Sequence, residues 1–242
     1  QCMLYCYIIC RTRAAGRLAG GFWAFQQNRE GCTSMSHSLC LPNYSVGEDC
    51  YQKIGYYARH CGKKAAVIGG KTAMEKARDA LQALMDNEAV RRADMLFGVG
   101  GGRACDLCKY VATKLDKPLF LFPTVASNCA SVTAISVMYH PDGTFREDYY
   151  PNLPEHTFIH TGIIAGSPYA LLWAGIGDAL SKECEAVFAS KGATLKFEPL
   201  MGVQLSKVCT EPLLMYGAQA LAACREKRVT PELEQVVLDI IV

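Results

Sequence analysis

Residues 93–127 read ADMLFGVGGGRACDLCKYVATKLDKPLFLFPTVAS and contain the clearest structural pattern in the chain. An apolar run from Met95 to Val99 predicts a strand, and the glycine cluster after it predicts a turn. Apolar residues then recur at helical spacing as far as Lys117-Pro118, where the proline ends the helix. A nearly continuous apolar run follows, which is typical of a strand covered on both faces of a parallel sheet. The stretch therefore predicts a strand–turn–helix–strand unit of an α/β protein.

Further α/β elements flank this unit on both sides. Residues 63–87 predict an earlier strand, a turn at Gly69-Gly70 and a helix. Residues 134–150 predict a β-hairpin around Pro141-Asp142-Gly143, because two runs rich in β-branched and aromatic residues surround those turn residues. Residues 156–168 predict another strand and turn.

From Ser167 onward the apolar spacing is helical throughout, including a stretch through residues 205–223. Thr230 followed by Pro231 predicts the start of a last helix, since threonine caps helices and proline suits the first helical position. We therefore expect a Rossmann-like, parallel-sheet α/β nucleotide-binding domain over residues 35–161, followed by an all-helical domain over residues 162–242.

The composition is that of an ordinary globular protein. Of 242 residues, 50% are hydrophobic and 20% charged, and the formal net charge is +2. This excludes extensive disorder and argues against a nucleic-acid partner, which would require a basic face. A membrane partner is also not expected, because the longest apolar run is too short to cross a bilayer. Thirteen cysteines scattered in apolar contexts are typical of reduced thiols, so we expect a cytoplasmic protein.

The two ends of the chain differ from the rest. Residues 1–34 contain four of the cysteines and four arginines but no lysine, and we expect them to be an upstream extension with Met35 as the natural start. An organelle transit peptide is the alternative. The last helix reaches Val242 as an apolar run without a cap, so we expect a truncated chain with an incomplete helical domain.

The glycine cluster at residues 98–103 is a candidate phosphate site. Glycines between a strand and a helix let the backbone approach a phosphate, and the helix start presents unpaired N–H groups. The strict dinucleotide fingerprint fails because Arg103 takes the place of the third glycine, so an ordinary tight turn is the alternative. The hydroxyl-bearing segment PTVAS at residues 123–127 ends the next parallel strand at the same edge, which favours a nucleotide ligand.

Three segments, in this order and spacing, resemble the glycerol dehydrogenase branch of the iron-containing alcohol dehydrogenase superfamily, which is related to dehydroquinate synthase. They read GVGGGRACDLCKYVA, FPTVASNCASVTAISVMY and AGIGDALSKECEA. The resemblance runs from about Leu39 to Val242. It implies a nucleotide-binding α/β domain followed by a helical metal-binding domain.

The resemblance also implies roles for individual residues. Asp178 would be a ligand of a catalytic divalent metal, zinc or iron, although an aspartate stabilising the start of a helix is the alternative. The cofactor NAD or NADP would meet the pyrophosphate-side residues Gly101, Gly102 and Arg103 with Asp106 nearby, the nucleotide-side residues Thr124 and Ser127, and the nicotinamide-side residues Thr133, Ile135 and Tyr139.

Three departures from the family pattern affect these expectations. The chain ends before the two histidines that complete the family's metal site, and His156 and His160 are weak substitutes. Cys129 stands where glycerol-specific members have an aspartate, so a 2-hydroxy acid competes with glycerol as substrate unless Cys129 only fills space. Gly70, followed by Lys71, stands where NAD-preferring members place an acid, which leaves the choice between NAD and NADP open.

We therefore expect an NAD(P)-dependent, metal-assisted oxidoreductase that acts on the CH–OH group of a small polyol or a 2-hydroxy acid. Asp178 and Cys129 are the candidate catalytic residues, and Gly70 joins the candidate cofactor-binding residues. The expected partners are a small alcohol or hydroxy acid and, in the full-length parent, further copies of the chain. A dehydroquinate synthase-like lyase and a catalytically inactive nucleotide-binding fragment are the alternatives.

Overall fold

The computed structural model describes residues 42–70, 91–140, 142–149 and 151–242. Five strands in these residues form one parallel sheet. Its order is β1 (Tyr44–Val46), β7 (His156–Ile159), β4 (Leu119–Pro123), β3 (Met95–Gly100) and β2 (Ala65–Gly69). The predicted α/β class with a parallel sheet is confirmed. The predicted extension at residues 1–34 and the predicted helix from Lys71 onward lie outside the described residues.

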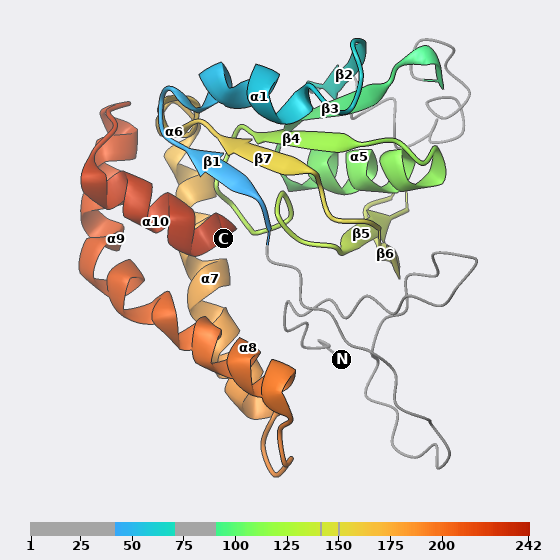
Figure 1. Cartoon of the computed structure of the whole chain (residues 1–242). Helices are drawn as coiled ribbons and strands as arrows, with labels where there is room; N and C mark the ends of the chain where they lie inside the picture. Colours follow the sequence, from blue (N-terminus) through green and yellow to red (C-terminus); the bar gives the residue numbers. More distant parts are fainter. Residues whose placement is uncertain (1–41, 71–90, 141, 150) are drawn as a thin grey trace, which may run out of the picture.

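Helices cover both faces of this sheet (Figure 1). Helix α5 (Gly102–Lys114) covers one face, where Cys108 and Val111 pack with Leu96 and Leu121. On the other face lie the short 3₁₀ helix η1 (Cys50–Lys53) and helix α1 (Ile54–Ala58), over an aromatic cluster. Central strand β4 is buried along its whole length, as its continuous apolar run predicts.

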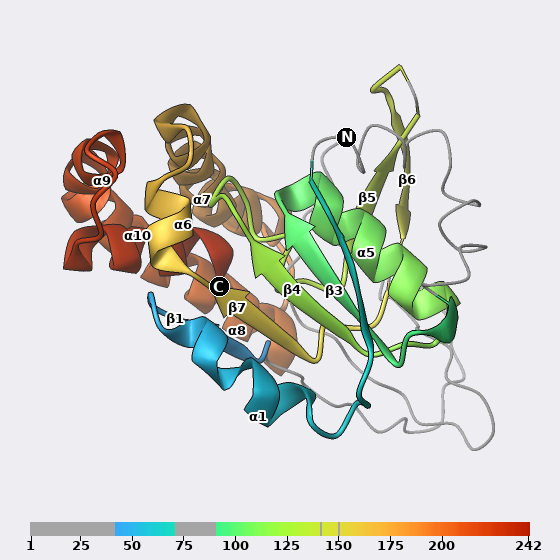
Figure 2. The ribbon, with the colours of Figure 1, turned by 90° about the horizontal axis from the view of Figure 1, so that it is seen from above.

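The predicted β-hairpin is present as a separate two-stranded antiparallel sheet. Its strands are β5 (Ser136–Tyr139) and β6 (Phe145–Tyr149). Among the described strands β5 pairs with β6 alone, so no ladder joins the hairpin to the main sheet. The hairpin lies instead beside helix α5, on which it depends for its position (Figure 2).

The chain after β7 is helical. The helices are α6 (Thr161–Ala165), α7 (Tyr169–Ala189), α8 (Phe197–Val208), α9 (Thr210–Arg225) and α10 (Pro231–Ile241). They lie beyond the carboxyl ends of the strands, where Figure 2 shows α6 and α7 next to the arrowheads of the sheet. Apolar side chains of these helices share one buried cluster with Ala126 and Ile159, so the helices pack directly on the sheet. None of the described helices is long and apolar enough to cross a membrane.

Two helix boundaries test the sequence reasoning. Thr230 caps α10 as predicted, with its Oγ1 accepting a hydrogen bond from the Leu233 amide at 3.2 Å and Pro231 at the first helical position. The helical stretch over residues 205–223 is two helices rather than one, and they meet at Cys209. Pro212 explains the break, because a proline ring collides with the carbonyl group four residues earlier in a continuous helix.

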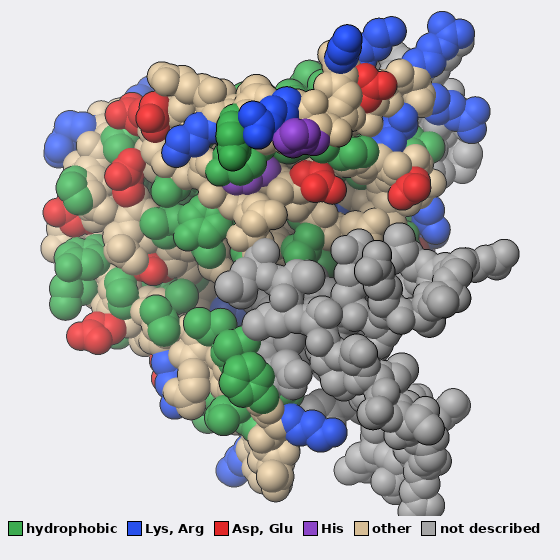
Figure 3. All heavy atoms as spheres, in the orientation of Figure 1, with side chains coloured by type: hydrophobic (Ala, Val, Ile, Leu, Met, Phe, Trp, Pro, Cys, Tyr) green, Lys and Arg blue, Asp and Glu red, His purple; other side chains and the backbone are tan. Residues whose placement is uncertain are grey.

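Exposed apolar side chains gather on the helical part, as the space-filling view shows (Figure 3). Leu205 and Val208 of α8 and Leu214 and Met215 of α9 are each more than half exposed. A hollow between α7, α8 and α9 is lined by Glu183, Lys207, Thr210, Glu211, Leu214 and Met215.

Candidate functional site

The turn between β3 and α5 contains glycines at positions where a side chain would come too close to neighbouring atoms. Gly100 has a φ of +152°, and a Cβ atom added there would lie 2.7 Å from the Cβ atom of Ala104. Gly101 precedes the helix in extended conformation. A Cβ atom on Gly102 would lie 2.6 Å from the side-chain nitrogen Nδ2 of Asn128. The first N–H groups of α5 have no acceptor within the helix, so this turn presents hydrogen-bond donors and a positive dipole to an anion.

The loop after β4 lies against this turn. The Thr124 amide donates to the Gly100 carbonyl oxygen at 3.1 Å, which places the hydroxyl-bearing segment beside the glycines. Helix α7 closes the other side, because a Cβ atom on Gly175 would lie only 2.2 Å from the carbonyl oxygen of Ala126. Sequence reasoning did not single out Gly175. A glycine within a helical pattern was the available signal, since glycine is disfavoured there unless packing requires it.

Arg103 and Tyr139 lie together although they come from different elements. The guanidinium carbon of Arg103 is 5.5 Å from the ring centroid of Tyr139, and 42% of Tyr139 is exposed. Arg103 belongs to the first turn of α5 and Tyr139 ends β5. The hairpin therefore borders the glycine turn on its solvent side.

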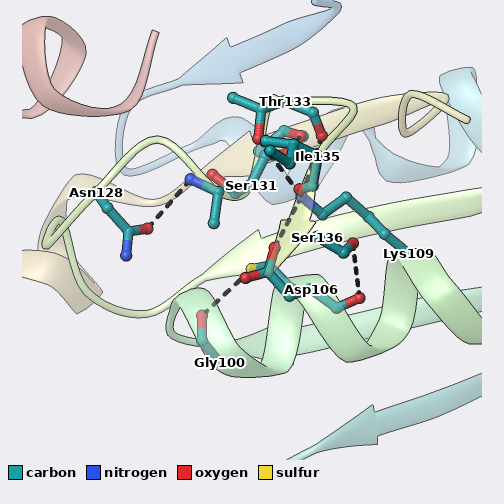
Figure 4. A network of polar contacts seen from close by, with 11 residues as sticks. Gly100, Asp106, Lys109, Asn128, Ser131, Thr133, Ile135 and Ser136 are labelled. Carbon is teal, nitrogen blue, oxygen red and sulfur yellow. Dashed lines mark hydrogen bonds and ion pairs between the residues drawn. The ribbon is translucent and has the colours of Figure 1, made fainter. Parts of the chain in front are cut away.

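Three other candidate residues meet at a buried lysine (Figure 4). Lys109 is fully buried, and its Nζ lies 2.9 Å from Oδ1 of Asp106 and 3.1 Å from the carbonyl oxygen of Thr133. The Ile135 carbonyl oxygen also accepts a hydrogen bond from Lys109. Burial raises the pKa of Asp106, and the Lys109 ammonium group opposes that rise. Sequence reasoning missed Lys109, for which the three-residue spacing of Asp106 and Lys109 on one helix was the available signal.

Asp178 lies in the middle of α7, so the alternative of an aspartate at a helix start is wrong. Its Oδ1 is 3.4 Å from Nζ of Lys182, which is also 3.4 Å from Oε2 of Glu185. Burial lowers the pKa of Lys182, but Asp178 and Glu185 outweigh this, so the pKa lies above its usual value. An electrostatic interaction with Cys129 also raises the pKa of Lys182. The structure thus brings the candidates Asp178 and Cys129 to one lysine that sequence reasoning missed.

The described residues do not form a metal site by themselves. No group of three or more histidine, cysteine, aspartate or glutamate side chains suited to a metal occurs in the described part of the chain. His156 has its Nε2 2.9 Å from Oγ of Ser45, and His160 caps α6 by accepting from the Ile163 amide at 3.3 Å. Both histidines are therefore engaged elsewhere.

The residues fit a dinucleotide better. The turn contains glycines at positions where a side chain would collide with neighbouring atoms. The start of α5 supplies backbone N–H donors. Thr124 and Ser127 are both partly exposed. Gly70 follows β2 with a φ of +86°, and within the described part of the chain no atom lies within 4 Å of the place where a Cβ atom would stand. Lys71, the other residue invoked for cofactor choice, lies outside the described residues.

Comparison with known proteins supports the family resemblance seen in the sequence. A family model described as iron-containing alcohol dehydrogenase matches residues 34–168. A glycerol dehydrogenase of Thermotoga maritima is 36% identical over 177 residues, covering 71% of this chain and 47% of that protein. Hydroxycarboxylate dehydrogenase A of Escherichia coli is 32% identical over 145 residues, covering 59% of this chain and 40% of that protein.

A solved structure shares the fold. The crystal structure of glycerol dehydrogenase from Schizosaccharomyces pombe matches with a TM-score of 0.67 and 25% identity, covering 83% of this chain and 59% of that one. The chain spans about half the length of the relatives it matches. The resemblance inferred from the sequence is confirmed.

Proposed function

The chain belongs to the iron-containing alcohol dehydrogenase family, and from this premise we propose that it serves an NAD(P)-dependent oxidoreductase reaction at the CH–OH group of a small alcohol. The substrate class is a polyol or a 2-hydroxy acid. The NAD(P) ring supplies the hydride acceptor for alcohol oxidation, and the protein supplies binding and orientation.

The observation that carries this proposal is the glycine turn between β3 and α5. It lies at the carboxyl ends of parallel strands, where such sheets bind ligands, and it opens a helix whose free N–H groups attract a pyrophosphate. Gly101 and Gly102 allow the close approach, and the Arg103 guanidinium group adds a positive charge beside them.

The other cofactor contacts follow from their position around this turn. We assign the nucleotide to the side of Thr124 and Ser127, and the nicotinamide ring to the side of Tyr139 and of the segment that contains Thr133 and Ile135. Asp106 lies on the helix that follows this turn, and its buried carboxylate is ion-paired with Lys109. Gly70 offers no carboxylate to the ribose, so we propose NAD or NADP as the cofactor without a preference between them.

On the resemblance alone, Asp178 is the candidate ligand of a zinc or iron ion. One carboxylate ion-paired with Lys182 is not a metal site, because catalytic zinc sites normally use three protein ligands. No reaction step is therefore assigned to the metal.

The substrate would lie near Cys129, Lys182 and Asp178. A carboxylate substrate would be attracted by the Lys182 ammonium group, whereas a polyol hydroxyl would donate to the Asp178 carboxylate. Both classes therefore remain in the proposal. The cytoplasmic location and self-association expected from the sequence are kept as part of it.

Cofactor binding tests the proposal directly. NADH and NADPH are titrated into the protein while their nicotinamide fluorescence is recorded, and at least one should bind. Gly102→Ala should weaken binding about tenfold, since a methyl group there displaces Asn128 and obstructs the charge-assisted hydrogen bonds to the pyrophosphate.

Gly177→Ala is the matched control, because a Cβ atom at Gly177 has no atom of the described residues within 4 Å beyond its own helix backbone. Its NADH affinity should equal that of the unmodified protein. A protein that binds neither reduced cofactor would overturn the proposal. NADH formation with glycerol or with a 2-hydroxy acid identifies the substrate class, and binding without turnover on either supports the nucleotide-binding part alone.

A further inference from the structure

We propose that Lys109 is a positioning residue that fixes the nicotinamide side of the dinucleotide site relative to its pyrophosphate side. The inference rests on the proposed function. It concerns a buried charge whose bonds, among the described residues, go to Asp106 on the same helix and to the segment on the nicotinamide side.

The bonds of Lys109 account for its complete burial. An ammonium group has three donors and no acceptor capacity, and burying it without partners is costly. Here Oδ1 of Asp106 lies at 2.9 Å, the Thr133 carbonyl oxygen at 3.1 Å and Oγ1 of Thr133 at 3.4 Å, and the Ile135 carbonyl oxygen accepts as well. The charge is therefore held by one carboxylate and by the backbone of residues 133–135.

Those acceptors belong to a largely buried segment that helix α5 contacts at several points. Residues 133–135 lead into β5, which among the described strands pairs with β6 alone. Besides the bonds of Lys109, Ser136 donates its hydroxyl to the Asp106 carbonyl oxygen at 3.0 Å, the Val137 amide donates to the Asp106 carboxylate, and Arg103 lies over Tyr139. Each of these ties runs from α5 to the segment, so the helix sets where the segment lies.

Helix α5 also carries the other half of the site. Its first residue is Gly102, and Lys109 follows seven residues later, which is about two helical turns. A helix is a rigid spacer over this length. Lys109 consequently fixes the distance between the turn proposed for the pyrophosphate and the segment proposed for the ring, as Figure 4 shows for Gly100 and Ile135 on the two sides of the network.

A positioning role and a purely structural role predict different binding data. ADP-ribose contains the adenosine and the pyrophosphate of NADH but lacks the nicotinamide ring. If Lys109 only stabilises the fold, its loss lowers the affinity for both ligands equally. If it positions the ring side, its loss lowers the affinity for NADH and spares that for ADP-ribose.

The experiment compares both ligands on Lys109→Met, which keeps the length of the side chain and removes its charge and donors. NADH affinity should fall at least tenfold, while ADP-ribose affinity should stay within twofold of the unmodified protein. The ratio is measured on one sample, so a reduced folded fraction affects both ligands alike.

Ser136→Ala is the second variant, for the case that Lys109→Met does not fold because Asp106 loses its ion pair. It removes one tie between α5 and the segment, and the ratio should move about threefold in the same direction. Thr161→Val is the control, because it removes a buried hydroxyl bond, to Glu234 at 3.0 Å, far from α5. It should lower stability without moving the ratio.

An unchanged ratio in Lys109→Met, or in Ser136→Ala if the first variant does not fold, overturns the positioning role while the proposed function stands. Unmodified protein that binds neither NADH nor ADP-ribose overturns the proposed function and this inference with it.

Discussion

His156 is a buried titratable side chain at the start of strand β7. It is 2% exposed, its ring stacks on Tyr57 with centroids 3.7 Å apart, and its Nε2 lies 2.9 Å from Oγ of Ser45. Its Nδ1 has no hydrogen-bond partner among the described residues. Burial, followed by the positive charge of Lys53, lowers the pKa of His156 to about 4. The native protein therefore contains a neutral histidine here at neutral pH.

This histidine should make the protein less stable in acid. Its folded pKa lies below the unfolded value of 6.5, so the unfolded chain takes up the proton first as the pH falls. The contribution of His156 to the free energy of unfolding is fully present above pH 6.5. It decreases as the pH falls from 6.5 to about 4, by about 3 kcal/mol in all. Urea unfolding at a series of pH values measures this slope.

His156→Phe should flatten the slope, because phenylalanine keeps the stacking on Tyr57 and cannot take up a proton. His60→Gln serves as the control, since His60 is exposed, and it should leave the slope as it is. If His156→Phe retains the full acid dependence, another group is responsible.

At the scale of single residues, sequence reasoning found the residues that local motifs mark. Gly101, Gly102 and Asp178 stand in short segments with a readable spacing, and their proposed roles remain predictions. Lys109 and Lys182 were missed because their importance comes from partners that the fold brings to them, such as Thr133, 24 residues away from Lys109.

Helix α7 contains two glycines that the structure treats differently. A Cβ atom on Gly175 would lie 2.2 Å from the carbonyl oxygen of Ala126, whereas one on Gly177 would have no neighbour within 4 Å in the part of the chain that the structure describes. Backbone cannot yield as a flexible side chain can. Of these two glycines, only Gly175 is therefore needed for the close contact between α7 and the loop after β4.

Gly175→Ala should destabilise the protein by about 2 kcal/mol, the usual cost of overpacking a close contact. Gly177→Ala should instead stabilise it by about 0.5–1 kcal/mol, because alanine favours a helix more than glycine does. Thermal unfolding of the two variants measures both effects. Equal changes in melting temperature would contradict the close approach of α7 to Ala126.

Gly175→Ala should also weaken NADH binding, because pushing α7 outward moves the loop that carries Thr124 and Ser127. Gly177→Ala should not. A destabilised Gly175→Ala variant with unchanged NADH affinity would show that the loop is held by its bond to Gly100 rather than by α7.

At the scale of elements, periodicity located strands and helices well but not every boundary. Strands β3 and β4 and the β5–β6 hairpin lie where the apolar runs and turn residues predict them. The break between α8 and α9 was missed because apolar spacing continues across it, and only the steric effect of Pro212 separates the two helices. The packing of Gly175 on Ala126 joins elements distant in sequence, which periodicity does not describe.

For the whole molecule, the boundary predicted at residues 161/162 divides a shared core. One buried cluster contains Ala126 from the loop after β4 and Ile159 from the end of β7, together with Leu172, Leu213 and Leu233 from α7, α9 and α10. Composition and periodicity could place an α/β part before a helical part, since each has its own spacing. They could not show that the two parts bury the same apolar surface, because that follows only from how the helices pack on the strand ends.

A shared core implies that the two parts unfold together, and Leu233→Ala tests this. Leu233 is fully buried in α10, so its truncation should cost about 2–5 kcal/mol.

The sample is heated with NADH present. Far-UV circular dichroism reports helix content, and nicotinamide fluorescence reports NADH bound at the glycine turn. Both transitions should move to the same lower temperature, because coincident probes are the mark of cooperative unfolding. Leu205→Ala, in an exposed position on α8, should leave both in place. If the helices melt early while NADH release keeps its original temperature, the parts are separate folding units.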